Sequence, residues 1–153
     1  MTTDPHDLDA QARAIVAANR YMVLSTADAD GRPWVSPVWF ASEDAITFLW
    51  ISKPGARHSQ NIASRPEIAI VVFDSSVAPD DAAALYVDAV AERLDGAERD
   101  TAVAAYSRAS TAQGLAAFTP DDVAEGARWR MYRATATARS VLGPGDERLP
   151  LGR

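Results

Sequence analysis

The sequence predicts a mainly β (α+β) protein, a small antiparallel barrel with short peripheral helices. Three observations support this fold class. Six segments are strand-like in length and pattern, the early ones are joined by tight turns, and helical segments do not alternate regularly with strands. Tight turns require antiparallel pairing, whereas a parallel doubly wound sheet needs a crossover between successive strands. The sequence therefore favours a barrel over a dinucleotide-binding sheet.

The chain begins with a predicted helix and a β-hairpin. Residues 7–19 place apolar side chains at helical spacing. Residues 21–26 and 32–41 are strand-like, and the turn between them contains Gly31. Glycine adopts the positive φ that such turns need without steric strain. These segments therefore predict a helix followed by two paired strands.

The middle of the chain predicts a strand, a turn, a short helix and another strand. Residues 45–51 are apolar, and Pro54-Gly55 after them is a typical turn pair. A helix-compatible segment begins near Arg57 and stops before Pro66. The unbroken apolar run of residues 68–73 predicts a strand that is buried on both faces.

The second half of the chain predicts two more strands and two more helices. Residues 85–94 and 129–137 alternate between apolar and polar side chains, as half-buried strands do. Residues 98–110 have helical spacing, and Thr119-Pro120 is a typical start of a short helix. With no repeat and no linker in between, residues 1–153 are predicted to form one domain.

Composition excludes several functional classes. The 153 residues include no cysteine and two histidines, so a disulfide framework, a cysteine nucleophile and a histidine-rich metal centre are excluded, and we predict no metal site. The net charge of −6 argues against nucleic-acid binding. No apolar run reaches the ~20 residues of a membrane span. Because the start of the chain does not resemble a signal peptide, we expect a cytoplasmic protein that binds no membrane.

The segment around Arg57 and His58 is the most informative part of the sequence for function. These residues lie at the predicted start of a helix, where free backbone N–H groups favour an anion. A guanidinium and an imidazole add side-chain donors to them. The pattern indicates a phosphate site, and the alternative is two ordinary polar residues on an exposed first turn.

Three stretches in this order give the chain its resemblance to a known family. The first is Val23-Leu24-Ser25-Thr26 with Asp30-Gly31-Arg32-Pro33, the second is Trp34-Val35-Ser36-Pro37-Val38-Trp39-Phe40, and the third runs from Ser52 through Arg57-His58-Ser59-Gln60-Asn61-Ile62 to Arg65-Pro66. Together they resemble the pyridoxamine 5′-phosphate oxidase-like split β-barrel superfamily of flavin- and deazaflavin-binding proteins. The resemblance implies a six- to seven-stranded antiparallel split β-barrel.

The resemblance also implies a cofactor site between two copies of the chain. Basic residues at Arg57 and His58 would hold the cofactor phosphate, the isoalloxazine ring would lie along the strand around Ser36, and the end of the next strand would flank the ribityl chain. The implied partner is a second copy, forming a homodimer, with Trp129 as a candidate for closing the site. The predicted cofactor-binding residues are Ser36, Val38, Trp39, Trp50, Ser52, Arg57, His58 and Asn61.

These residues predict an FMN-dependent oxidoreductase that acts on a small organic molecule. The flavin supplies hydride chemistry, so the chain needs no acid–base triad, and no catalytic residue is predicted. The alternatives are a reductase that uses the deazaflavin coenzyme F-420 and a flavin or haem carrier without turnover. For Trp34, Trp39 and Trp50 the alternative to ligand contact is packing in the core or in the dimer interface.

Overall fold

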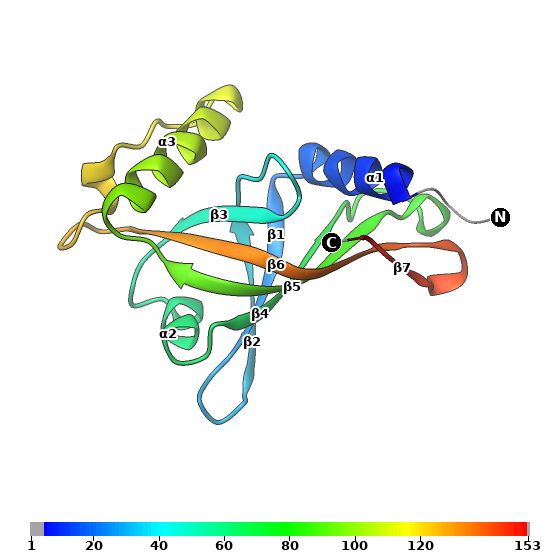
Figure 1. Ribbon diagram of the computed structural model, residues 1–153, viewed down its shortest axis with the longest axis horizontal. Helices are drawn as coiled ribbons and strands as arrows, with labels where there is room; N and C mark the ends of the chain where they lie inside the picture. The colour runs from blue at the N-terminus through cyan, green and yellow to red at the C-terminus, as the bar shows by residue number, and fades with distance from the viewer. Residues whose placement is uncertain (1–4, 153) are drawn as a thin grey trace.

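Seven antiparallel strands form one strongly curled sheet in the computed structural model, which describes residues 5–152 (Figure 1). The strand order is β2-β1-β4-β5-β6-β3, and β7 pairs with the free part of β6. The strands are β1 (Tyr21–Ala27), β2 (Pro33–Trp39), β3 (Thr47–Ser52), β4 (Glu67–Phe73), β5 (Ala84–Arg93), β6 (Arg130–Leu142) and β7 (Arg148–Pro150). This arrangement confirms the predicted split β-barrel.

Three α-helices accompany the sheet. They are α1 (Pro5–Ala18), α2 (Arg57–Ser64) and α3 (Gly96–Ala112), and the short 3-10 helices are Pro79–Asp81, Pro120–Val123 and Pro144–Asp146. Strand β6 runs past the predicted end at residue 137, and β7 was not predicted. No helix among residues 5–152 has the length and apolar character to cross a membrane. Residues 1–4, on which the expectation of a cytoplasmic protein partly depends, lie outside the described range.

Strand alternation divides the side chains between an inner and an outer face of the curled sheet. Leu24 pairs with Ser36, so both side chains point inward, and Ser25 pairs with Val35, so both point outward. The inner face carries the main core, which includes Phe48 at 0% exposure. Each such apolar side chain contributes about 1.5–3 kcal/mol when it is fully buried.

Helices close the two ends of the inner face. The apolar stripe of α1, with Leu8 and Ile15, packs into the main core, as its helical spacing predicted. Helix α2 contributes Ile62 to the same core and contacts β1, β2 and β5. The two helices lie at different ends of the sheet in Figure 1.

Helix α3 covers one part of the outer face only. It packs Val103 and Tyr106 against Leu49 of β3 and Met131 of β6, which form a second core. The outer face of β1, β4 and β5 lies under no helix of the described chain, and large apolar side chains there are exposed, among them Val90 at 41%. The continuous apolar run of β4 predicted burial on both faces; this is wrong, since Phe73 and Ala69 are exposed.

Candidate functional site

The start of α2 carries backbone donors that the helix itself does not use. Strand β3 ends at Ser52, and a turn closed by the Ala56 N–H donating to the Lys53 carbonyl at 3.1 Å leads into the helix. Ala56 is the extended N-cap residue, and no side chain caps the helix. The N–H groups of the first turn therefore have no acceptor within the helix, and they are available to hydrogen-bond an anion.

A short hydrogen bond joins two predicted site residues at this position. The Oγ of Ser52 and the Nε2 of His58 are 2.6 Å apart. Ser52 is buried and His58 is half-buried. Burial lowers the pKa of the His58 imidazole, because removal from water disfavours the charged form. The imidazole is therefore neutral near pH 7 until an anion beside it favours the proton.

Ser59 adds an unusual feature to the first turn of α2. Its hydroxyl is buried and has no hydrogen-bond partner. A buried polar atom without a partner destabilises a fold by about 1–3 kcal/mol, so native proteins rarely retain one without use for it. The Ser59 hydroxyl is enclosed by the protein, so the donors open to an anion at the helix start are the first-turn N–H groups, Arg57 and His58, and this donor set fits a phosphate.

Arg57 is held on the side of the β1–β2 hairpin. Its guanidinium carbon lies 4.4 Å from the ring centre of Trp34, a cation–π contact. Arg57 is exposed, and it takes part in none of the ion pairs found within residues 5–152. The structure thus places Arg57, His58 and Ser52 at one end of the barrel, and their contacts with a cofactor stay predictions.

The predicted residues on β2 are divided between the two faces of the sheet. Ser36 and Val38 point inward, on the same face as Trp34 and toward α2. Trp39 points outward, where its Nε1 donates to Gln113 Oε1 at 3.1 Å and its ring meets Tyr106 edge-on at 4.9 Å. Because adjacent strand residues face opposite ways, Trp39 cannot share a surface with Ser36 and Val38.

Two other predicted site residues have structural contacts. The Trp50 indole is fully buried and stacks on Tyr132 at 5.6 Å, which leaves only its backbone free to meet a ligand of this chain. The amide of Asn61 is buried and donates from Nδ2 to Thr26 Oγ1 at 3.0 Å, which ties α2 to β1. Cofactor contacts from these two residues stay predictions.

Arg130 is a candidate residue that was not predicted. It lies opposite Ser52 in the β3–β6 register, and its side chain is buried. Its Nη1 donates to the carbonyls of Ala127 at 2.7 Å and Trp129 at 2.8 Å, while its Nε has no partner. Strand alternation places Arg130 on the same face as the buried Tyr132. A charged residue at an inward position was the signal that could have identified it.

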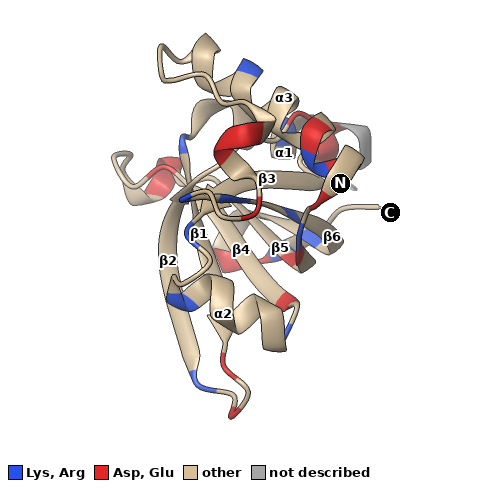
Figure 2. Ribbon diagram, turned by 90° about the vertical axis from the view of Figure 1, so that its left-hand side faces the viewer, with Lys and Arg blue, Asp and Glu red and all other residues tan. Residues whose placement is uncertain are grey.

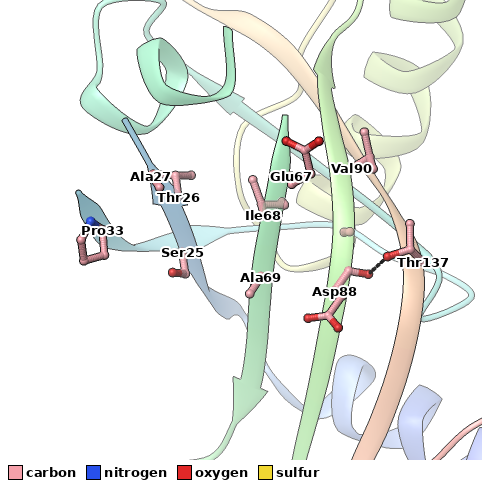
Figure 3. A pocket seen from close by; sticks show the side chains of 11 residues that line it. Ser25, Thr26, Ala27, Pro33, Glu67, Ile68, Ala69, Asp88, Val90 and Thr137 are labelled. Atoms are coloured by element: carbon pink, nitrogen blue, oxygen red, sulfur yellow. Dashed lines mark hydrogen bonds between the residues drawn. The ribbon is translucent and has the colours of Figure 1, made fainter. Parts of the chain in front are cut away.

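The outer face of the sheet carries a shallow trough (Figure 3). A pocket of about 490 Å³ crosses β1, β4, β5 and β6, and a second pocket of about 300 Å³ adjoins it through Ser25, Ala69 and Asp88. Val23, Val35, Val71, Tyr86 and Val90 make most of its lining apolar. The position of this trough could not be predicted, because it depends on which face the helices leave uncovered.

Comparison with known proteins agrees with the fold of the chain. A family model described as Pyridoxamine 5′-phosphate oxidase matches residues 8–140. None of the curated proteins compared with the chain matches it.

Several solved structures are similar in fold. A haem-binding protein from Mycobacterium smegmatis is 21% identical with a TM-score of 0.74, and the match covers 98% of this chain but only 58% of that protein. An F420 reductase is 25% identical with a TM-score of 0.57, over 78% of this chain and 88% of the other. An FAD-binding protein from Mesorhizobium loti is 19% identical with a TM-score of 0.65, over 84% and 87%.

Proposed function

The chain belongs to the pyridoxamine 5′-phosphate oxidase family, and from this premise we propose that it is an FMN-dependent oxidoreductase acting on a small organic molecule. The start of α2 carries the proposal, since uncapped N–H groups, Arg57 and the Ser52–His58 pair lie there together. Such a donor set suits the phosphate of FMN. The flavin, when bound, supplies the hydride chemistry.

In this proposal the residues of the chain bind the cofactor and orient it. Arg57 and His58 hold the phosphate, and the Ser52 hydroxyl fixes the orientation of the imidazole. Ser36 faces inward from β2 and offers a half-buried hydroxyl, with Val38 of the main core behind it on the same face.

We further propose that a second copy of the chain covers the outer trough. Val35, Phe73 and Val90 are 56%, 44% and 41% exposed beside it, which is unusual for large apolar side chains that cluster on one face. Strand β2 is also an edge strand, whose unpaired backbone groups favour an interface. A two-fold dimer would bury both features, and sedimentation at low micromolar concentration tests it, since a monomeric mass contradicts it.

Cofactor titration tests the enzymatic proposal. Purified protein is titrated with FMN, with coenzyme F-420 and with haem, and the absorbance spectrum identifies which one is retained after gel filtration. We expect FMN to bind with micromolar or better affinity. We also expect bound FMN, once it has been reduced with dithionite, to be reoxidised by quinones, nitro compounds or enones faster than free reduced FMN. Retention of none of these compounds would contradict the proposal.

A deazaflavin-dependent reductase is the second candidate, because the F420 reductase is 25% identical over 78% of the chain. The same titration separates it from the FMN enzyme. A haem carrier is less favoured by the geometry. The Nε2 of His58 is hydrogen-bonded to the Ser52 hydroxyl, so iron ligation through that nitrogen would break a 2.6 Å hydrogen bond.

A further inference from the structure

One face of α2 is tied to the β1–β2 hairpin, beside which the helix lies (Figure 2). Arg57 and Asn61 are four residues apart and share this face, and Arg65 follows four residues later at the end of the helix. The Asn61 amide donates to the hydroxyl of Thr26 at 3.0 Å, and the Arg65 Nη2 donates to the carbonyl of Ala29 at 3.1 Å. These two hydrogen bonds fix the helix against the hairpin beyond its first turn.

A third contact on this face joins Arg57 in the first turn of α2 to Trp34 of β2. The guanidinium carbon lies 4.4 Å from the centre of the indole ring. The backbone of Trp34 belongs to the same set of bonds, because the Thr26 hydroxyl that accepts the Asn61 bond donates to the Trp34 carbonyl at 3.5 Å. The ring and the start of α2 are therefore placed relative to each other by bonds that do not involve Arg57 itself.

The face of an aromatic ring attracts a guanidinium without accepting its N–H donors through a lone pair, so the donors stay open to a second partner. A carboxylate in the same place would occupy those donors and neutralise the charge. The hairpin does carry a carboxylate, that of Asp28, but its Oδ1 accepts the backbone N–H groups of Asp30 and Arg32, both at 2.9 Å. Among residues 5–152 it forms no ion pair with Arg57. Arg57 is thus restrained in position and remains available to an anion.

We propose that Trp34 is a positioning residue, whose ring holds the Arg57 guanidinium at the anion site before the cofactor binds. The inference rests on the proposed function, in which Arg57 binds the phosphate of FMN. Trp34 is 39% exposed and belongs to neither core of the described chain, so core packing does not account for its ring. An unrestrained arginine side chain loses rotamer freedom when it binds a ligand, and restraint beforehand lowers that entropic cost. In this role Trp34 acts through Arg57 and only on ligands that carry the phosphate.

The test is a double-mutant cycle with two flavins that differ only in the phosphate, FMN and riboflavin. Dissociation constants for both are measured on the wild type, on Trp34→Leu, on Arg57→Ala and on the variant with both substitutions. Trp34→Phe keeps an aromatic ring, and Tyr21→Leu, which removes an exposed ring from the outer face of β1, is the matched control. Circular dichroism checks the fold of each variant, and Trp34→Met replaces Trp34→Leu if the latter does not fold.

We expect Trp34→Leu to bind FMN about three- to tenfold more weakly, while its affinity for riboflavin changes less than about twofold. Trp34→Phe should lose less FMN affinity than Trp34→Leu, because phenylalanine still offers a ring face to the cation. In the Arg57→Ala background, replacement of Trp34 should cause no further loss.

Three results would overturn the positioning role while the wild type still binds FMN and the proposed function stands. They are equal losses for FMN and riboflavin, a loss that persists undiminished in the Arg57→Ala background, and no loss at all. If the wild type binds neither flavin, the positioning role and the proposed function are both overturned.

Discussion

The two ends of the barrel are closed by helices of opposite character. Helix α1 closes one end with apolar side chains such as Ile15 and Val16, which pack directly into the main core. Helix α2 closes the other end with a single core residue, Ile62, and buries the polar side chains of Ser59 and Asn61. Buried polar groups stabilise a fold less than apolar ones, and this difference between the described side chains of the two helices supports the proposal that the α2 end is the one used for binding.

The largest effect is expected at the apolar end. Replacing Ile15 with Ala removes buried methyl groups from α1, and we expect it to lower the free energy of unfolding by about 2–5 kcal/mol. Cofactor affinity measured well below the melting temperature should not change. Denaturant unfolding and a cofactor titration check both expectations. A variant that loses affinity while it is fully folded would show that the two ends are not independent.

The corresponding change at the polar end is Arg57→Ala. Arg57 is exposed, and its guanidinium stacks on the Trp34 ring, so stability should change by less than about 0.5 kcal/mol. A charge-assisted contact to the cofactor phosphate is worth about 1.5–3 kcal/mol, which corresponds to about a ten- to hundredfold loss of affinity. Isothermal titration with FMN measures it, and Arg20→Ala is the matched control. Unchanged affinity in Arg57→Ala would place the phosphate elsewhere.

Ser59→Ala sharpens the comparison within α2 itself. The substitution removes a buried hydroxyl that has no partner, so the free energy of unfolding should stay the same or rise by up to about 1 kcal/mol. Asn61→Ala is the contrast, because it breaks the bond to Thr26 and should destabilise the protein by about 1–3 kcal/mol. Thermal melts of both variants test this. A large destabilisation by Ser59→Ala would mean that the hydroxyl already has a structural partner.

The smallest effect is a pH dependence from His58. Because burial lowers its pKa in the folded state, the unfolded chain binds the proton more readily. The folded state is therefore not penalised by His58 above the imidazole pKa of the unfolded chain, about 6.5. The protein loses stability as the pH falls below that value toward the lowered pKa of His58 in the folded state. We expect His58→Asn to flatten the fall in unfolding free energy between about pH 8 and 5.5. Parallel curves for the two proteins would show that His58 does not titrate in this range.

Cofactor binding should depend on pH in the opposite direction to folding stability. A phosphate beside His58 favours the imidazolium, so FMN affinity should rise as the pH is lowered through the neutral range. The phosphate of FMN itself loses charge on acidification, with a pKa of about 6. The informative quantity is therefore the difference in the pH dependence of FMN affinity between the wild type and His58→Asn. Titrations in buffers of different ionisation enthalpy count the proton taken up. Equal proton uptake in both proteins would contradict the role of His58.

The sequence by itself determined the elements and their local chemistry. Alternation identified strands such as β5, helical spacing identified the apolar stripe of α1, and the position of Arg57 and His58 after a Pro-Gly turn located the start of α2. These features depend on residues close together in the chain. Local backbone geometry and side-chain spacing are sufficient to specify them.

Only the tertiary structure decided which side chains share a surface. Alternation along β2 already puts Trp39 and Ser36 on opposite faces, but it is the packing of distant helices that puts α3 over the face of Trp39. Trp50 is enclosed because Tyr132 of β6 stacks on it, and the exposed trough exists because α3 covers a different part of the outer face. Burial of a side chain depends on strands and helices that are distant in the sequence. Pairing and packing between such distant segments decide it, and no local pattern encodes them.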